Sequence, residues 1–480
     1  MAVENNLNVR VSKIDEDVRK RDVEAARGIF DPSLNLGTTY AKNREPTASI
    51  LYVPGVTTIG LNKFETLSYY GSISGTHLLG TRYELRVSQS ERDNPTVNKT
   101  FTLLNPIAQT QVTAALRQPL LKGAWYTVNT ADVRIAENTA RLAREQLELV
   151  IIDTVFRVEE AYWNLLFATK NLEAKEKTLE VTLANLENVR RKRQVGTLAA
   201  IDVTTAESQV ALRRAEVEEA KLLAENARDE LLNLVNYTGD RSLKELWEDG
   251  TRRLPFDEIQ LNPTTPPEFA GPPPDRHGAL SLAFSRRPEY RQLDLNLLND
   301  EIRLSVAKNA LLPSLDVIGQ WTQAGLQDSL AESWDELGTG RYYSWFAGVE
   351  FSIPIPNRGP RNAYRNAQDS IRRTRLQRMD LENRIVLEVD AAIRTIASLR
   401  RKVAELEERV RLQSELLQAE RVKLEAGKSI PYTVSVIEND LVADQTNALR
   451  ANADLQRAIA EFHRATGTLL ERHRIQVVSD

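Results

Sequence analysis

The residue types that carry most enzyme chemistry are few and scattered in this chain. It has no cysteine, which excludes a disulfide, a thiolate metal site and a cysteine nucleophile. No two of its histidines lie four residues apart as a zinc site on a helix would require, and the four are His77, His277, His463 and His473. Gly338-Thr339-Gly340 lacks the third glycine and the strand-to-helix setting of a phosphate-binding loop. Glu159-Glu160 lies in helical sequence and is interpreted as a solvated pair. We therefore predict no enzyme activity, no metal and no cofactor.

Composition narrows the class of protein further. The 480 residues are 27% charged with a net charge of −4, so neither nucleic acid nor an anionic surface is an expected partner. No run of about 18 apolar residues exists, so the chain can cross a bilayer only as a β-barrel. Met1-Ala2-Val3-Glu4 enters directly into amphipathic helix with no signal-peptide pattern. If the protein is exported, its leader has been removed.

The sequence contains an internal duplication. Gly196 and Gly427 lie 231 positions apart, and the same offset carries Val158 onto Val389 through helical sequence on both sides of the glycine. A second offset, 281, places Pro32-Ser33-Leu34 on Pro313-Ser314-Leu315. The first copy therefore holds about fifty extra residues between its first strand and its helices. We predict a first repeat over 1–252, a proline-rich connector over 253–278 and a second repeat over 279–480.

Each repeat is predicted to contain a long helical hairpin, at about 125–236 and 361–467. Seventy residues of strong helix formers without glycine or proline make a rod of about 100 Å. Ile385, Val389, Ala392 and Ile396 begin a heptad seam, which alone is typical of a coiled coil. Gly196 and Gly427 are expected to end the ascending helices in the left-handed conformation. Two hydroxyl residues are expected to cap the return helices, namely Thr197 and Ser429.

The segments at about 33–118 and 314–353 change to a period of two. Alternation of this kind is typical of barrel strands and equally of a soluble sheet with one wet face. The extra residues of the first repeat predict two further strands, which give six per chain if they join the sheet and four if they fold outside it. Aromatics gather here as candidate membrane-interface residues, namely Tyr40, Tyr83, Trp321, Tyr342, Tyr343 and Trp345. Because so few strands cannot close a wide barrel, we expect an oligomer.

At this point the chain resembles the TolC-like outer-membrane efflux protein family over essentially its whole length. The residues that carry the resemblance are Gln118-Pro119-Leu120-Leu121-Lys122-Gly123, Val195-Gly196-Thr197 followed by Asp202-Val203, and Arg287-Pro288-Glu289-Tyr290. The resemblance implies a mainly α fold with a β-barrel, in which a homotrimer forms a transmembrane barrel continued by an α-helical barrel across the periplasm. Family members usually contribute four strands per chain.

The resemblance also implies two kinds of site. Adaptor-docking tips would lie at Val195, Gly196, Thr197, Gly427, Lys428 and Ser429. A closed periplasmic aperture, often ringed by acids, would lie nearby, and the candidates are Asp202, Glu207, Thr433, Glu438, Asp440 and Asp444. The second tip has Thr433 where the first has Asp202, and Val436 occupies another place where family members can carry aspartate, so the usual acidic ring is partly missing. Glu207, Glu438, Asp440 and Asp444 could substitute for it, although the simpler interpretation is that they are ordinary solvated helix charges.

We therefore predict the passive outer-membrane channel of a tripartite efflux pump or type I secretion system. Its partners would be a periplasmic adaptor, an inner-membrane transporter and outer-membrane lipid, and it would reach from the outer membrane into the periplasm. The alternatives are a soluble coiled-coil scaffold and the periplasmic adaptor itself, which carries one hairpin rather than two. The connector would be an extended strap around the helices or a disordered linker. The sequence does not predict the cargo, and an N-terminal lipid anchor stays undecided.

Overall fold

The structure, a computed structural model, describes residues 2–47, 60–95, 103–236, 259, 261–264 and 275–476. The chain divides into two compact units, one of Met1–Asp17, Leu142–Asp294 and Leu376–Asp480, the other of Val18–Arg141 and Leu295–Arg375. Each unit takes segments from both halves of the sequence. Most of the predicted connector lies outside the described residues.

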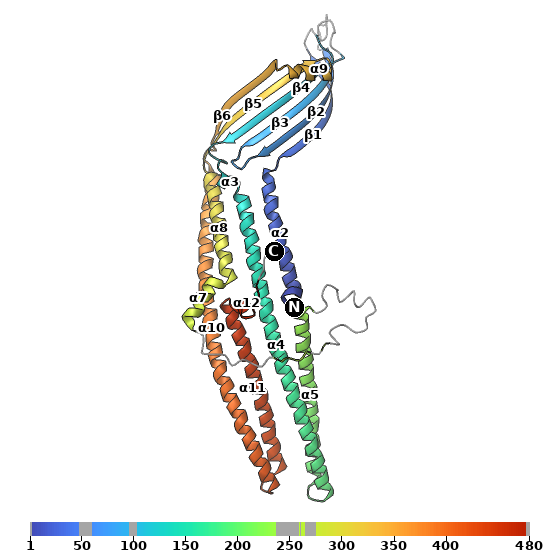
Figure 1. Cartoon of the computed structure of the whole chain (residues 1–480), viewed down its shortest axis with the longest axis vertical. Coiled ribbons are helices and arrows are strands. Elements are labelled where there is room, and N and C mark those ends of the chain that lie inside the picture. The colour runs from blue at the N-terminus through green and yellow to red at the C-terminus, as the bar shows by residue number, and fades with distance from the viewer. Residues whose placement is uncertain are drawn as a thin grey trace. The chain divides into compact units, whose positions relative to one another are not determined.

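Six antiparallel strands form one sheet in chain order (Figure 1). They are β1 (Ser33–Thr47), β2 (Gly60–Thr76), β3 (Arg82–Asp93), β4 (Ile107–Pro119), β5 (Ser314–Gln327) and β6 (Tyr342–Ser352). The pairing of β4 with β5 joins the first half of the sequence to the second, with Ala108 opposite Gln327 and Pro119 opposite Asp316. The two strands predicted from the extra residues are β2 and β3, and both lie inside this sheet.

The two faces of the sheet differ in chemistry. Directly opposed residues of antiparallel strands share a face, and neighbours along a strand alternate. Large hydrophobic side chains exposed to solvent in the single chain gather on one face, which we call the apolar face: Leu34, Leu36, Tyr40, Leu61, Tyr69, Ile73, Leu85, Leu116, Val317, Trp321, Tyr343, Trp345, Val349 and Phe351. The opposite, polar face carries hydroxyls and amides, including Asn35, Thr39, Ser68, Ser72, Ser88, Ser90, Gln111, Thr113 and Gln320.

A short helix, α9 (Leu330–Gly338), packs on one end of the apolar face (Figure 1). Ser333 and Thr110 are both fully buried there, and their hydroxyl oxygens lie 2.6 Å apart. A Cβ on Gly325 would lie 2.0 Å from the Ser333 carbonyl oxygen, so only glycine allows this approach of helix to strand. The sequence analysis did not predict this helix.

The helices agree closely with the periodicity. They are α1 (Ala2–Asn5), α2 (Leu7–Arg27), the 3₁₀ turn η1 (Gly28–Phe30), α3 (Tyr126–Asn129), α4 (Ala131–Gln194), α5 (Ala200–Val235), α7 (Arg276–Arg286), α8 (Pro288–Asn309), α10 (Arg358–Glu425), α11 (Pro431–Ala465) and α12 (Leu469–Arg472). None of the helices in the described residues is long and apolar enough to span a membrane.

Two hairpins, α4–α5 and α10–α11, make up most of the first of the two compact units, which we call the helical unit (Figure 1). Between α4 and α5, Leu186 and Val189 pack against Val203 and Val210. The predicted seam on α10 is confirmed, because its apolar positions Ile385, Val389, Ala392, Ile396 and Val403 are all buried. Ile396 and Val403 pack against α11 residues, including Ala451 and Leu455. Apolar contacts of this kind join the two helices of each hairpin.

Candidate functional site

Both hairpins turn at a glycine in the left-handed conformation. The φ angle is 79° at Gly196 and 70° at Gly427, as the sequence predicted. In both turns the amide after the glycine donates back across the last helical turn, the arrangement of a Schellman motif. These bonds run from Thr197 N–H to the Lys192 carbonyl at 2.9 Å and from Lys428 N–H to the Lys423 carbonyl at 2.8 Å.

The predicted caps of the return helices are wrong. The Thr197 hydroxyl donates to the Lys192 carbonyl at 2.8 Å, where it satisfies one of the last carbonyls of α4. The first turn of α5 is instead stabilised by Asp202, whose carboxylate accepts a hydrogen bond from the Ala199 N–H at 2.9 Å. The N-cap residue of α5 is Ala199, two residues after the predicted Thr197.

At the second tip, too, the predicted cap residue bonds elsewhere. Ser429 donates from its hydroxyl to the Glu420 carboxylate at 2.5 Å, and Ile430 rather than Ser429 is the N-cap residue of α11. The carboxylate of Glu420 also lies 3.0 Å from the Lys423 ammonium. Pro431 begins α11, where its missing N–H costs no hydrogen bond, as predicted.

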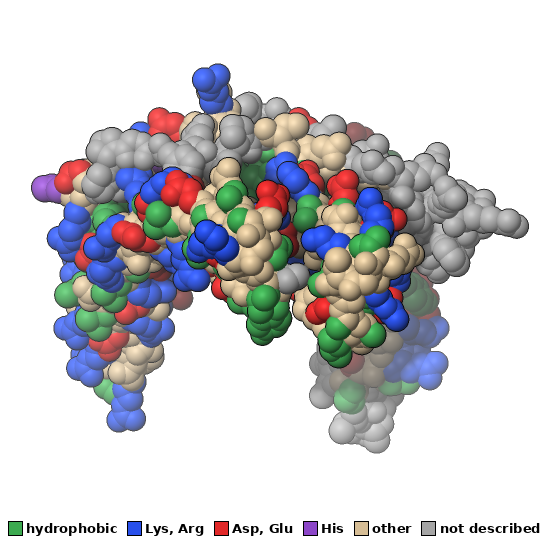
Figure 2. Space-filling view, turned by 90° about the horizontal axis from the view of Figure 1, so that it is seen from below, with side chains coloured by type: hydrophobic (Ala, Val, Ile, Leu, Met, Phe, Trp, Pro, Cys, Tyr) green, Lys and Arg blue, Asp and Glu red, His purple; other side chains and the backbone are tan. Residues whose placement is uncertain are grey.

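Exposed apolar side chains surround both turns. Val195 is 75% exposed and Ile201 67% exposed on the first tip, while Ile430 is 59% and Tyr432 67% exposed on the second. Lys428 is also exposed. Figure 2, which views the chain from the end where the tips lie, shows hydrophobic side chains next to lysine and arginine on this surface. Exposed apolar groups beside charges are typical of surfaces that bind another protein.

Two of the predicted aperture carboxylates occupy equivalent places. Glu207 lies 2.6 Å from the Arg190 guanidinium across the first hairpin, and Glu438 lies 2.8 Å from the Arg421 guanidinium across the second. The offset of 231 relates the two arginines as well as the two acids. Each pair connects an ascending helix with its return helix near the tip.

The other candidate residues have varied surroundings. Asp444 is buried, and its carboxylate accepts from Arg409 at 2.8 Å, which places it in the contact between α10 and α11. Asp440 is exposed and Thr433 is half-buried near the start of α11. Asp202 is held by the cap of α5. The docking and aperture roles of all these residues remain predictions.

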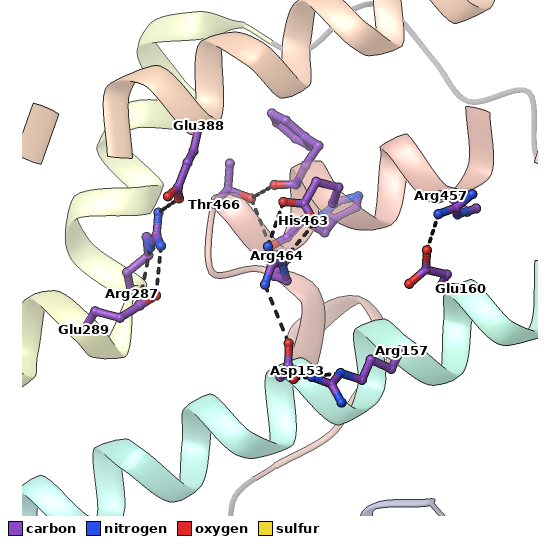
Figure 3. A network of polar contacts seen from close by, with 12 residues as sticks. Asp153, Arg157, Glu160, Arg287, Glu289, Glu388, Arg457, His463, Arg464 and Thr466 are labelled. Carbon is purple, nitrogen blue, oxygen red and sulfur yellow. Dashed lines mark hydrogen bonds and ion pairs between the residues drawn. The ribbon is translucent and has the colours of Figure 1, made fainter. Parts of the chain in front are cut away.

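An ion-pair network that the sequence analysis missed lies in the helical unit (Figure 3). Arg287, in the junction between α7 and α8, contacts Glu289 at 2.8 Å and Glu388 at 2.5 Å. Arg464, near the end of α11, contacts Glu461 at 2.9 Å and Asp153 of α4 at 3.6 Å. The motif that holds Arg287 and Glu289 was visible in the sequence, but Glu388 lies 101 residues away, so spacing alone could not reveal it.

The charges of this network are matched. Burial raises the pKa of the Glu289 carboxyl, but the Arg287 guanidinium bonded to it brings that pKa below its ordinary value. A cavity of about 700 Å³ adjoins the network and is lined in part by Asn6, Arg287, Glu388 and Arg464. These ion pairs connect α8 with α10 through Arg287 and α11 with α4 through Arg464.

The interpretation of Glu159 and Glu160 as a solvated pair is wrong. The Glu159 side chain is only 9% exposed and lies 3.0 Å from His473 and 3.4 Å from Arg472. Burial raises the pKa of Glu159, and its hydrogen bond with His473 and the Arg472 charge more than offset this, so the pKa lies below its usual value. Glu160 pairs with Arg457 of α11 (Figure 3). Both acids therefore bind the last part of the chain to α4.

The candidate interface aromatics lie on the sheet, and five of the six share the apolar face. Trp321 and Trp345 are direct partners on β5 and β6, and Tyr343 lies one pair further along that face. Tyr40 on β1 and Tyr83 on β3 lie on it as well. Tyr342 lies on the polar face. The sequence identified the aromatics, but only the register shows which side of the sheet each one occupies.

No group of three or more metal-ligating side chains occurs in the part of the chain that the structure describes. The described residues form a sheet with one apolar and one polar face and two equivalent helical hairpins, whose tips expose apolar and basic side chains.

The fold is that of a sheet protein with a duplicated helical hairpin, and comparison with known proteins identifies the family. A model of the outer membrane efflux protein family matches residues 1–237 and 279–468. The chain belongs to this family. A search of curated proteins found no match.

Solved structures share the fold. A membrane protein from Pseudomonas aeruginosa is 17% identical with a TM-score of 0.68, and the match covers 97% of this chain and 92% of that one. The outer membrane protein VceC from Vibrio cholerae is 13% identical with a TM-score of 0.67, covering 97% and 94%. The CmeC outer membrane channel of Campylobacter jejuni is 14% identical with a TM-score of 0.66, covering 100% and 85%.

Proposed function

We propose that this protein is the outer-membrane channel of a tripartite efflux pump or type I secretion system and acts as a homotrimer. The observation that carries the proposal is the apolar face of the sheet, where aromatic and aliphatic side chains are exposed from β1 to β6. Trp345 and Val349 are each 69% exposed in the single chain. A continuous apolar surface of this kind requires a partner, and lipid is the partner that fits a sheet whose opposite face is polar.

The edges of the sheet support closure between copies. β1 and β6 each pair with one neighbouring strand in the described residues. An open edge with free backbone groups is not tolerated in a membrane, because no water is present to hydrogen-bond them. Pairing β1 of one copy with β6 of the next would bring apolar face beside apolar face and would close a barrel.

The helical hairpins would extend into the periplasm. Their tips would meet the adaptor protein through Val195, Gly196 and Thr197 on the first hairpin and through Gly427, Lys428 and Ser429 on the second. The exposed Ile201, Ile430 and Tyr432 enlarge this surface beyond the residues that the sequence predicted. The acids near the tips would line the closed end of the duct.

The channel would be passive. Members of the outer membrane efflux protein family are transport channels. Energy for export would come from an inner-membrane transporter, to which the adaptor connects the channel. The two alternatives are not favoured. A soluble scaffold would leave the apolar face in water, and an adaptor carries one hairpin whereas this chain has two.

Reconstitution in a planar lipid bilayer tests the proposal. Detergent-solubilised protein should run as a trimer and give discrete conductance steps. A strictly monomeric species with no conductance at any protein concentration would contradict it.

A further inference from the structure

The hairpin formed by β2 and β3 has no counterpart in the second half of the chain. The offset of 281 relates β1 to β5, since it carries Ser33 onto Ser314, and the offset of 231 places β4 on β6. Between β5 and β6 lies α9 rather than two strands. The duplication alone therefore accounts for two strands in each half, and β2 and β3 are an addition.

The added hairpin lies within the sheet, not at its margin. β2 pairs with β1 without a break from Gly60 to Ser74, and β3 pairs with β4 without a break from Arg82 to Arg92. β1 therefore has no contact with β4 in the ladder, and its only strand partner in the described residues is β2. The hairpin is therefore the element that joins β1 to the rest of the sheet in this structure.

The side chains of the hairpin continue both faces of the sheet. On its apolar face Ile73 of β2 lies opposite Leu85 of β3 and Gly71 opposite Val87, whereas Leu67 and Tyr69 lie opposite Glu91 and Gln89. Its polar face carries the hydroxyl groups of Ser68, Ser72, Ser74, Ser88 and Ser90. From Leu67 to Ile73 on β2 and from Tyr83 to Val87 on β3, the strands have the alternation of a wall between lipid and water. Beyond this stretch Glu65, Gln89 and Glu91 place polar groups on the same face.

Two arginines on the polar face lie flat against the hairpin. The Arg86 guanidinium carbon is 4.3 Å from the centre of the Tyr70 ring, and that of Arg92 is 3.7 Å from the centre of the Phe64 ring. Cation–π stacking holds these long side chains along the wall instead of across the space in front of it. The polar face of the hairpin therefore carries hydroxyl groups together with the charged side chains Arg82, Glu84, Arg86 and Arg92.

We propose that the β2–β3 hairpin widens the pore, so that the duct passes cargo of larger cross-section than a barrel built from two strands per repeat could pass. This rests on the proposed function. Three six-stranded sheets give about 18 strands where the duplication alone would give about 12, and because diameter grows roughly linearly with strand number, the bore increases by about 1.5-fold and its area by about 2-fold. With this wider bore, the cargo class is a bulky, hydrated solute or chain.

Single-cysteine variants test the position of the hairpin, and the chain has no native cysteine to interfere. Ser88 and Val87 are neighbours on β3 that lie on the polar and the apolar face respectively. In bilayer-reconstituted protein, S88C should react with a charged, water-soluble methanethiosulfonate reagent, and each reaction should lower the conductance. V87C should not react with that reagent. Equal reaction at both positions without a change in conductance would place the hairpin outside the wall and overturn the proposal.

A size measurement tests the bore itself. In a second variant, residues 48–106 are replaced by an Asn-Gly turn that joins Thr47 to Ile107, which restores the two-strand plan of the second repeat. Its conductance should be about half that of the full chain, and it should exclude neutral polyethylene glycols that still enter the full chain. Equal conductance and equal polymer cut-off would overturn the proposal.

The outcomes separate the two proposals. Conductance from trimers with no effect of S88C modification rejects the widened wall and leaves the channel intact. No conductance from the unmodified full chain rejects the proposed function itself. If the shortened variant does not fold, the cysteine pair still decides the inference.

Discussion

Glu207 and Glu438 hold the same place in two hairpins that lie 231 residues apart in the sequence. Each carboxylate accepts a hydrogen bond from an arginine 17 residues before it, at 2.6 Å from Arg190 and at 2.8 Å from Arg421. The two copies have thus kept the ion pair that joins ascending and return helix close to the turn. Exposed pairs of this kind contribute at most about 1 kcal/mol, so their equivalence indicates a shared geometry of the tips more than a source of stability.

The glycines of the tips should be required for export and not for assembly. In the G196V and G427V variants a β-branched residue must adopt φ near 79° or 70°, although no heavy atom lies within 4 Å of the added Cβ. Backbone strain of about 1–3 kcal/mol should distort each turn locally. Cells that depend on the channel should lose export while trimers persist on native gels.

Asparagine provides the matched control at both positions, because it tolerates the left-handed conformation. G196N and G427N should retain most of the export. Full export by both valine variants would reject the assignment of the tips as docking sites.

Charge on the two faces of β6 should have unequal effects. Trp345 lies on the apolar face and its neighbour Phe346 on the polar face, and both are at least half exposed in the single chain. If the apolar face meets lipid, W345R should destabilise the folded protein by about 2–4 kcal/mol, whereas F346R should cost about 1 kcal/mol or less. Urea unfolding in lipid vesicles measures both. Equal effects would show that the two faces do not differ in their surroundings.

The packing of α9 against the sheet depends on the absence of a side chain at Gly325. The G325A variant would place a Cβ 2.0 Å from the Ser333 carbonyl oxygen and 2.6 Å from the Leu337 nitrogen, so α9 must move. We expect a loss of about 1–3 kcal/mol and a change in the fluorescence of Trp334. On the same strand, Gly319 has only the Phe346 carbonyl oxygen at 3.9 Å, so G319A should be nearly neutral. A neutral G325A would contradict the close packing of α9.

Acid should weaken the helical unit partly through His463. Burial lowers its pKa from 6.5 to about 4, the nearby Arg472 and His473 add to this, and Glu159 opposes it. Because the folded pKa lies below the unfolded one, the unfolded state binds the proton more readily, and stability falls as pH drops from 6.5 toward 4. The loss is at most about 3 kcal/mol, and less because the ring retains some solvent contact.

The H463Q variant tests this pH dependence. Its free energy of unfolding should vary less than that of the native chain between pH 6.5 and 4. The loss from the carboxylates Glu159 and Glu289, whose pKa values are lowered, belongs to the region below their ordinary value of 4.5. Identical pH profiles for both proteins would exclude His463 as the cause.

Periodicity and duplication predicted the regular elements well, because local spacing is what determines them. The seam through Ile385 and Val389 and the turns at Gly196 and Gly427 follow from positions only a few residues apart. The strand count was left open, since sequence shows that β2 and β3 are extended but not which strands they join. That decision depends on contacts between residues such as Arg82 and Arg117, far apart in the chain.

Predictions failed where a side chain had several partners to choose from. Thr197 and Ser429 are good capping residues, yet their hydroxyls bond to Lys192 and Glu420 instead. Glu159 sits in a helix like any solvated acid, but the end of the chain returns to cover it with Arg472 and His473. The contacts of Glu159 are tertiary and leave no periodic trace in the sequence, whereas those of Thr197 and Ser429 are local alternatives to capping.

Electron cryomicroscopy of the purified protein in lipid nanodiscs tests the central claim most directly. The account predicts three copies around one axis, joined edge to edge by β1 and β6 into a closed wall of about 18 strands with an open interior. A lone protomer, or an assembly with no central channel, would contradict it.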